Sequence, residues 1–188
     1  IACKVFNPFR PVISLRLNNR DHRKICVIDG HTAFTGGVNL ADEYINEIER
    51  FGHWKDCGIL VRGKAVWSMT VMFLSLWGYV DRSEEDVSRF RADYPEKRGG
   101  TGFLQPFADS PLDNEDVGAT ILQSVISSAQ ERMWIMTPYL ILDSEMITAL
   151  TRAAKSGIEV IIIMPHIPDK WYAFVLAHTY YKELIQAG

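Results

Sequence analysis

Residues 21–40 read DHRKICVIDGHTAFTGGVNL and give the strongest local structural signal in the chain. The part KICVID is rich in β-branched residues, and Asp29-Gly30 is a favoured sequence for a tight turn between two strands. The part TAFTGG then returns with a second β-rich run. We therefore predict an antiparallel hairpin over residues 24–36.

Polar side chains stand at both ends of the first strand of this hairpin. His22 and Lys24 are two residues apart, so both side chains point to the same face if the backbone is extended there. Asp29 stands at the other end, beside the turn, and completes the pattern H-x-K-x4-D. Gly37 and Asn39 follow on the returning side. The sequence thus gathers several chemically useful residues around one short hairpin.

Such a set of residues suits chemistry at a phosphodiester. A neutral imidazole, here His22, can attack phosphorus and form a covalent phosphohistidine. An ammonium group and an amide, here Lys24 and Asn39, can stabilise the charged phosphoryl oxygens, and glycine lets the backbone come close to a substrate. The Asp29 carboxylate can fix the imidazole tautomer and stabilise its charged form. Chance also places these residue types around apolar strands, but the added GGVN segment favours a phosphate site, which would need neither metal nor cofactor.

The composition is that of a globular protein. The 188 residues are 47% hydrophobic and 23% charged, and the net charge of −3 gives no general reason to expect nucleic acid as a partner. The cysteines are odd in number and form no C-x-x-C pair, so neither a disulfide framework nor a zinc site is expected. Cys26 and Cys57 lie in apolar runs, where we expect buried, reduced thiols.

One uncharged run, AVWSMTVMFLSLWGYV at 65–80, could be mistaken for a membrane span. It has 16 residues, whereas a spanning helix needs about 20. We therefore expect a buried helix and no transmembrane segment. The aromatic residues at positions 67, 73 and 77 leave contact with a membrane surface open as a second role.

Around this helix, the first part of the chain is predicted to hold one more strand and two shorter helices. Residues 95–114, rich in Pro, Gly and Asp, are predicted to form a linker after them. The apolar pattern predicts a helix over 41–50, a strand over 56–63, the long helix over 64–80 and a short helix over 83–94.

After the linker the pattern becomes regular. Strands are predicted over 132–140 and 158–165, joined by a helix over 143–157, and a strand–helix–strand unit of this kind makes its two strands parallel. Such apolar parallel strands are expected to be covered on both faces. Further helices are predicted over 115–130 and 169–188. The linker either joins two halves of one α/β protein or leaves the C-terminal part as an independent module, and the shared strand and helix pattern favours the first.

These stretches resemble the phospholipase D superfamily, and bacterial cardiolipin synthases most closely. NRDHRKICVIDGHTAFTGGVNLADEY is similar to the region around the family's first HKD motif, and HWKDCGILVRGKAVWSMTVMFLSLW is similar to its W-x-D strand and the helix that follows. QPFADSPLDNEDVG and WIMTPYLILDSEMITALTRAAKSGIEVIIIMPHIPDKW resemble its second half. Nearly the whole chain is covered, so the resemblance does not depend on one motif.

The resemblance implies an α/β fold of the phospholipase D-like type, with a mixed sheet flanked by helices. Members have two similar halves, and each half contributes one HKD motif to a shared active site. Residues 1–94 would be the first half, truncated at its N-terminus and carrying the HKD motif. Residues 95–114 would be the linker, and 115–188 the start of the second half, truncated at its C-terminus.

The resemblance also implies an activity. Cardiolipin synthases transfer the phosphatidyl group of one phosphatidylglycerol to a hydroxyl of a second one and release glycerol, without a cofactor. By position, His22 would be the nucleophile and Asp29 would support the motif. Lys24, Gly37 and Asn39 would hold the phosphate. The expected partners are anionic phospholipid and the membrane surface, and the expected location is the cell membrane.

The chain contains no second H-x-K-x4-D motif. His166 and His178 each have a lysine four residues on instead of two. We therefore expect one half-site and little or no transferase activity from these residues alone, because no second acid is present to protonate the leaving glycerol. A homodimer that brings two copies of His22 into one site would be the exception.

Other histidines and the loops after the two parallel strands are secondary candidates for the site. Tyr139 follows the first of these strands, and His166 and Asp169 follow the second, at the edge where α/β sites tend to form. We expect His31 to be a solvated loop residue and His53 to be structural.

Two other classes of function remain open on the sequence alone. The first is another phospholipase D-type enzyme, such as a phosphatidylserine synthase, a lipid hydrolase or a nuclease, although a nuclease would show more positive charge around the site. The second is a non-catalytic half that only binds anionic lipid or a partner, which the intact motif argues against. The basic residues near the motif would suit an anionic lipid headgroup equally well: Arg10, Arg16, Arg20, Arg23 and Lys24.

Overall fold

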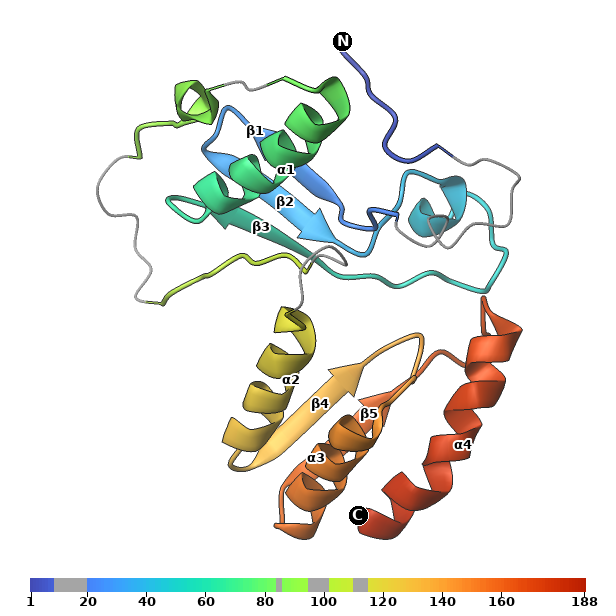
Figure 1. Cartoon of the computed structure of the whole chain (residues 1–188). Helices are drawn as coiled ribbons and strands as arrows, with labels where there is room; N and C mark the ends of the chain where they lie inside the picture. The colour runs from blue at the N-terminus through green and yellow to red at the C-terminus, as the bar shows by residue number, and fades with distance from the viewer. Residues whose placement is uncertain (9–19, 84–85, 95–101, 110–114) are drawn as a thin grey trace. The chain divides into compact units, whose positions relative to one another are not determined.

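The computed structural model describes residues 1–8, 20–83, 86–94, 102–109 and 115–188 of the chain (Figure 1). The chain divides into two compact units. Both units combine strands with helices, which confirms the expected α/β class. The first unit consists of Ile1–Ile48 and Trp54–Asp113, and the second of Glu49–His53 and Asn114–Gly188.

The predicted hairpin is the centre of the first unit. Strands β1 (Ile25–Ile28) and β2 (Thr32–Gly36) pair antiparallel, and β3 (Gly58–Arg62) adds to the other edge of β2, in the order β1-β2-β3. Asp29 and Gly30 both have a positive φ, of 52° and 65°. Glycine adopts this conformation without strain and Asp tolerates it, which is why this pair forms the turn.

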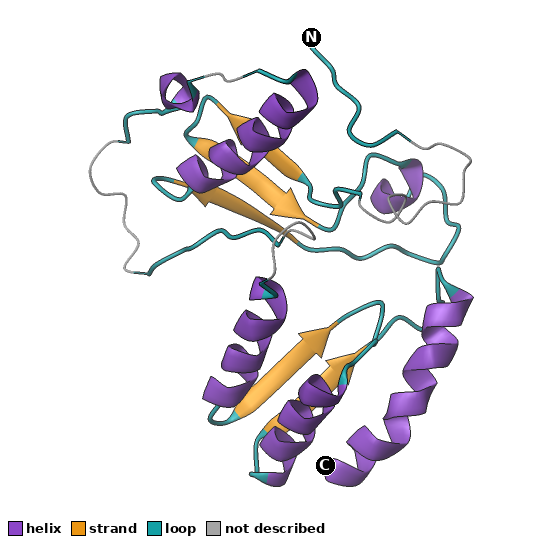
Figure 2. Ribbon diagram, in the orientation of Figure 1, coloured by secondary structure: helices purple, strands orange, loops and turns teal. Residues whose placement is uncertain are grey.

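Helix α1 (Val66–Asp81) lies across one face of this sheet (Figure 2). Alternate strand residues face the helix, since successive side chains of a strand point to opposite faces. The predicted helix is confirmed, but its expected burial holds for one face only, since Val66, Met69 and Thr70 are buried whereas Phe73 is 47% exposed. The buried core consists of Ala33, Val61, Val66 and Met69, with Ile25 and Val27 packed against it.

The expected burial of Cys26 and Cys57 is wrong, because both thiols are exposed. Cys26 lies between Ile25 and Val27, which face α1, so its own side chain points to the opposite face of the sheet. Among the described residues of the first unit no helix covers that second face, where Phe34 on β2 is 41% exposed. The apolar run of β1 therefore belongs to a strand with one face packed against α1.

The helix predicted over residues 41–50 is wrong in type and length. Only a 3₁₀ helix, η2 (Asp42–Ile45), forms there. It ends because Asn46 adopts a left-handed conformation with φ 62°, and its side chain bonds to the backbone of Trp54. The Trp54 backbone N–H donates to Asn46 Oδ1 at 2.6 Å, and Asn46 Nδ2 donates to Trp54 O at 3.1 Å. These two bonds replace the helical continuation.

The helix predicted over 83–94 is also shorter than expected. A single 3₁₀ turn, η3 (Val87–Phe90), forms in the described part of this stretch. Asp86 precedes it and accepts a hydrogen bond from the backbone N–H of Ser88. The residues after η3 then run in extended form past the hairpin turn.

The second unit is the predicted strand–helix–strand arrangement. Strands β4 (Arg132–Met136) and β5 (Glu159–Ile163) are parallel, and α3 (Ser144–Lys155) connects them. Helices α2 (Val117–Ser128) and α4 (Trp171–Ala187) pack on either side of α3 (Figure 1). The parallel pairing and the three helices are therefore confirmed, with boundaries a few residues inside the predicted ones.

The expectation that both faces of this sheet are covered is wrong for the described residues. Met133, Ile135, Val160 and Ile162 pack against the helices. The alternate residues point away from them, and Trp134 on β4 is 63% exposed. The described strands form one antiparallel and one parallel sheet, so both kinds of pairing are present, which is consistent with the expected mixed sheet.

Residues 102–109, the described middle of the predicted linker, form neither helix nor strand, and the rest of the linker lies outside the described residues. Among the helices that the structure describes, none combines the length and the apolar character needed to cross a membrane.

Candidate active site

His22 and Lys24 lie directly before β1, at the edge of the three-stranded sheet. The His22 side chain is exposed, and Lys24 is half-buried. The Lys24 ammonium donates to the backbone carbonyl of His22 at 2.6 Å. The ammonium is thus held beside the backbone carbonyl of His22.

An ion pair brackets His22 in the sequence. Arg23 Nε donates to Asp21 Oδ1 at 2.8 Å and Arg23 Nη2 donates to Asp21 Oδ2 at 2.9 Å, so the pair is bidentate. The hydrogen bonds from Arg23 lower the pKa of the Asp21 carboxyl below its usual value. The pair joins the two residues on either side of His22. Arg10 and Arg16, the more distant members of the predicted basic cluster, lie outside the described residues.

Asp29 lies in the turn at the other end of β1. A strand rises about 3.3 Å per residue, so the five-residue step from Lys24 to Asp29 spans roughly 16 Å. The first member of the H-x-K-x4-D pattern and its last are therefore at opposite ends of the strand, and the predicted support of His22 by Asp29 remains a prediction.

The turn that carries Asp29 is held by the segment after η3. Tyr94 Oη donates to the Gly30 carbonyl at 2.8 Å, and burial raises the pKa of the Tyr94 phenol. His31, expected to be a solvated loop residue, is exposed, but its Nε2 lies 3.1 Å from Asp93 O and its ring contacts that of Tyr94. Contacts about sixty residues apart in sequence thus fix the turn.

Gly37 lies where β2 meets the entry to β3, and the contacts there explain why it is glycine. A Cβ at Gly37 would lie 2.2 Å from Asp56 Oδ1, and its backbone N–H donates to Cys57 O at 3.2 Å. In the structure Gly37 therefore packs against Asp56. The contact between Gly37 and a phosphate remains a prediction.

Asn39 is tied to an aromatic pair. Its Nδ2 donates to Tyr44 Oη at 2.6 Å, and the rings of Tyr44 and Trp54 are 4.5 Å apart. Trp54 Nε1 donates in turn to Asp56 Oδ2 at 3.1 Å. Sequence reasoning did not select Tyr44 or Asp56 as site residues. The signal that could have found Asp56 is the W-x-D spacing itself, because it places an acceptor two residues from an indole N–H.

The secondary candidates lie in the second unit, at the carboxyl ends of its two strands. Tyr139 Oη donates to Asp169 Oδ2 at 2.5 Å, so the structure brings these two predicted residues together. His166 is exposed on the same loop as Asp169, and His53 is exposed on the segment Glu49–His53. Across the part of the chain that the structure describes, no three His, Cys, Asp or Glu side chains come together as a metal site.

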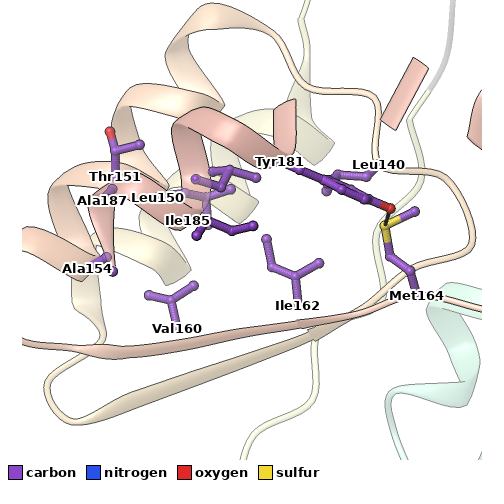
Figure 3. A pocket seen from close by; sticks show the side chains of 12 residues that line it. Leu140, Leu150, Thr151, Ala154, Val160, Ile162, Met164, Tyr181, Ile185 and Ala187 are labelled. Carbon is purple, nitrogen blue, oxygen red and sulfur yellow. Dashed lines mark hydrogen bonds between the residues drawn. The ribbon is translucent and has the colours of Figure 1, made fainter. Parts of the chain in front are cut away.

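The second unit also contains an apolar cavity of about 300 Å³ between α3, β5 and α4 (Figure 3). Val160 and Ile162 point into it from β5, and Leu150 points into it from α3. Its most polar feature is Tyr181, whose hydroxyl donates to Met164 Sδ at 3.3 Å. The lining offers no charged group to a phosphate, so we do not assign it to the reaction.

Comparison with known proteins shows what the chain resembles. The family model described as "Cardiolipin synthase, PLD-like domain" matches residues 122–188. A protein named cardiolipin synthase from Geobacillus thermodenitrificans is 37% identical over 97% of the chain. The chain is therefore similar to proteins named cardiolipin synthase over nearly its whole length, and residues 122–188 match their PLD-like domain. The resemblance seen in the sequence is thereby confirmed.

Other similar proteins align over nearly the same length. Cardiolipin synthase 2 of Bacillus cereus is 36% identical over 97% of the chain, and a protein of Streptococcus mutans described as uncharacterized is 48% identical over all of it. These alignments cover 36% and 41% of the two relatives, and 37% of the Geobacillus protein. The chain therefore spans about two fifths of the length of these relatives. No solved structure gives a significant match.

Proposed function

We propose that the protein that contains this chain is a phospholipase D-type phosphatidyltransferase that makes cardiolipin from two molecules of phosphatidylglycerol. The observation that carries the proposal is the hairpin with its motif. His22 is exposed beside the Lys24 ammonium, and Asn39 is fixed on the returning side. The names of the relatives support the same reaction.

The proposed first step forms a covalent intermediate. An imidazole nitrogen of His22 attacks the phosphorus of phosphatidylglycerol, a P–N bond forms, and the P–O bond to glycerol breaks. Lys24 and Asn39 stabilise the charge that develops on the phosphoryl oxygens. The departing glycerol oxygen takes a proton from a general acid, which is typically worth about 10² to 10⁴ in rate.

In the second step the phosphatidyl group moves to its acceptor. A hydroxyl of another phosphatidylglycerol attacks phosphorus and gives its proton to the group that served as the acid, and the P–N bond breaks. The product is cardiolipin, and His22 returns to its neutral form. No cofactor takes part in this scheme.

The general acid is proposed to come from a second half of similar fold, of which the second unit would be the start. Residues 1–188 alone would then turn over slowly, unless two copies pair and share their histidines. The substrates are anionic phospholipids, so we place the reaction at the surface of the cell membrane.

The test is a turnover assay on the protein at its full natural length. Phosphatidylglycerol labelled in its glycerol headgroup is supplied in detergent micelles, and cardiolipin and free glycerol are measured. We expect one glycerol per cardiolipin, and a loss of at least about 10³-fold for His22→Ala, as for other nucleophiles. The control is His178→Gln, which removes an exposed imidazole from α4.

The product pattern separates the alternatives. Release of phosphatidic acid without cardiolipin would point to a lipid hydrolase, and transfer to added serine to a phosphatidylserine synthase. Cleavage of an oligonucleotide would point to a nuclease. Tight lipid binding with no turnover by any of these routes would contradict the proposed enzyme and support the non-catalytic alternative.

A further inference from the structure

We propose that Tyr44 and Asp56 are positioning residues that hold Asn39 in the orientation in which its amide meets the phosphate. The proposal rests on the proposed function of this site and extends it to two residues outside the H-x-K-x4-D motif. Tyr44 bonds to Asn39, and Asp56 packs against Gly37 on the same segment. We call this set of contacts, which runs from Tyr44 through Trp54 to Asp56, the bracket.

The first part of the bracket fixes the Asn39 amide. The terminal torsion of an asparagine side chain has broad preferences, so the amide turns freely unless a partner holds it. Tyr44 is that partner, with Oη accepting from Asn39 Nδ2 at 2.6 Å, and both side chains are half-buried. This bond uses one of the two amide hydrogens of Asn39. It thereby fixes the direction of the second hydrogen, which we propose donates to the phosphate.

Tyr44 is in turn fixed by Trp54. The two rings are 4.5 Å apart and inclined at 53°, a geometry in which the phenol has little freedom to swing. Trp54 is held by two hydrogen bonds between its backbone and the side-chain amide of Asn46, at the end of η2. The tyrosine hydroxyl therefore has a defined position relative to the chain that carries Asn39.

Asp56 closes the bracket with both of its carboxylate oxygens. Oδ2 accepts from Trp54 Nε1 at 3.1 Å, and Oδ1 accepts from the backbone N–H of Cys57 at 2.8 Å. Its carboxylate lies in the space that a Cβ on Gly37 would need. An asparagine here would present an N–H to one of these donors, and so Asp56→Asn removes one bond without changing the size of the side chain.

The deciding experiment is a double-mutant cycle between Tyr44→Phe and Asn39→Ala in the full-length protein. Two readouts are used: formation of cardiolipin from phosphatidylglycerol, and hydrolysis of bis(4-nitrophenyl) phosphate. We expect Asn39→Ala to lower kcat by about 10²-fold and Tyr44→Phe by roughly 10-fold, with KM little changed. In the Asn39→Ala background, Tyr44→Phe is expected to have no further effect beyond about twofold.

The controls separate positioning from folding. Tyr79→Phe removes a phenol hydroxyl from α1, outside the bracket, and is expected to leave kcat unchanged. Asp56→Asn is expected to lower kcat in wild type and not in the Asn39→Ala background. If Tyr44→Phe or Asp56→Asn fails to fold, the double-mutant cycle with Asn39→Ala is measured with the other variant. Equal losses in both backgrounds would overturn the proposal, as would a loss of folded protein with normal kcat.

The two readouts test the positioning role of Tyr44 and Asp56 separately from the proposed synthesis of cardiolipin. Hydrolysis of the model phosphodiester with coupling, but no cardiolipin, would support the positioning role and contradict the substrate. Cardiolipin formation without coupling would do the reverse. A wild-type protein inactive on both substrates would overturn both.

Discussion

At the scale of single residues, the carboxylate of Asp56 fills the space beside Gly37, so that a residue with a side chain would not fit there. The backbone N–H of Gly37 is bonded to Cys57 O, and its Cα faces Asp56. The glycine therefore allows two chain segments to come together, and in the proposed mechanism the phosphate contact of this segment is made by Asn39.

Gly37→Ala is expected to lower the free energy of unfolding by about 1–3 kcal/mol, because the new methyl group would overlap Asp56 Oδ1. Urea denaturation measures the loss. The matched control is Gly58→Ala in the same sheet, where a Cβ would meet only Thr35 O at 3.6 Å, and little change is expected. A Gly37→Ala variant that is as stable as wild type but inactive would favour direct phosphate contact by Gly37 instead.

At the scale of elements, η2 owes its short length to a contact made by a residue beyond it. Asn46 turns the chain with a positive φ and bonds to the Trp54 backbone, which brings Trp54 against Tyr44. An extra turn of α-helix would carry Asn46 away from Trp54. The irregular segment between β2 and β3 is therefore what builds the aromatic pair beside Asn39.

Asn46→Ala is expected to destabilise the protein by about 2–3 kcal/mol, from the left-handed backbone of an alanine and the loss of the bonds to Trp54. Asn46→Gly keeps the backbone conformation and loses only the bonds, so it should cost about 1 kcal/mol less. Chemical denaturation of both variants measures the difference. If the two variants are equally stable, the left-handed turn does not contribute as described.

The same elements show what the sequence could and could not predict. The hairpin was predictable because the Asp29-Gly30 turn and the β-rich runs on each side are local signals. The length of η2 was not, because its end depends on Trp54, eight residues from Asn46. Burial of Cys26 failed because an apolar run does not show which face of a sheet is covered. The contact of Asp56 with Gly37 joins the residue after β2 to a residue before β3, so no local pattern contains it.

At the scale of the whole molecule, the chain provides two units and one complete H-x-K-x4-D motif. The first unit carries His22, Lys24 and Asn39, and the second carries the Tyr139–Asp169 pair. The chain spans about two fifths of its relatives, so the proposed transfer is a property to be tested at full length.

The most direct test of the central claim is to locate the covalent intermediate. The full-length protein is mixed with phosphatidylglycerol, denatured at alkaline pH because a P–N bond to histidine hydrolyses in acid, digested and analysed by mass spectrometry. The proposed mechanism predicts a phosphatidyl adduct on His22 in wild type and in His178→Gln, and none in His22→Ala. An adduct on any other residue, or one that persists in His22→Ala, would contradict it.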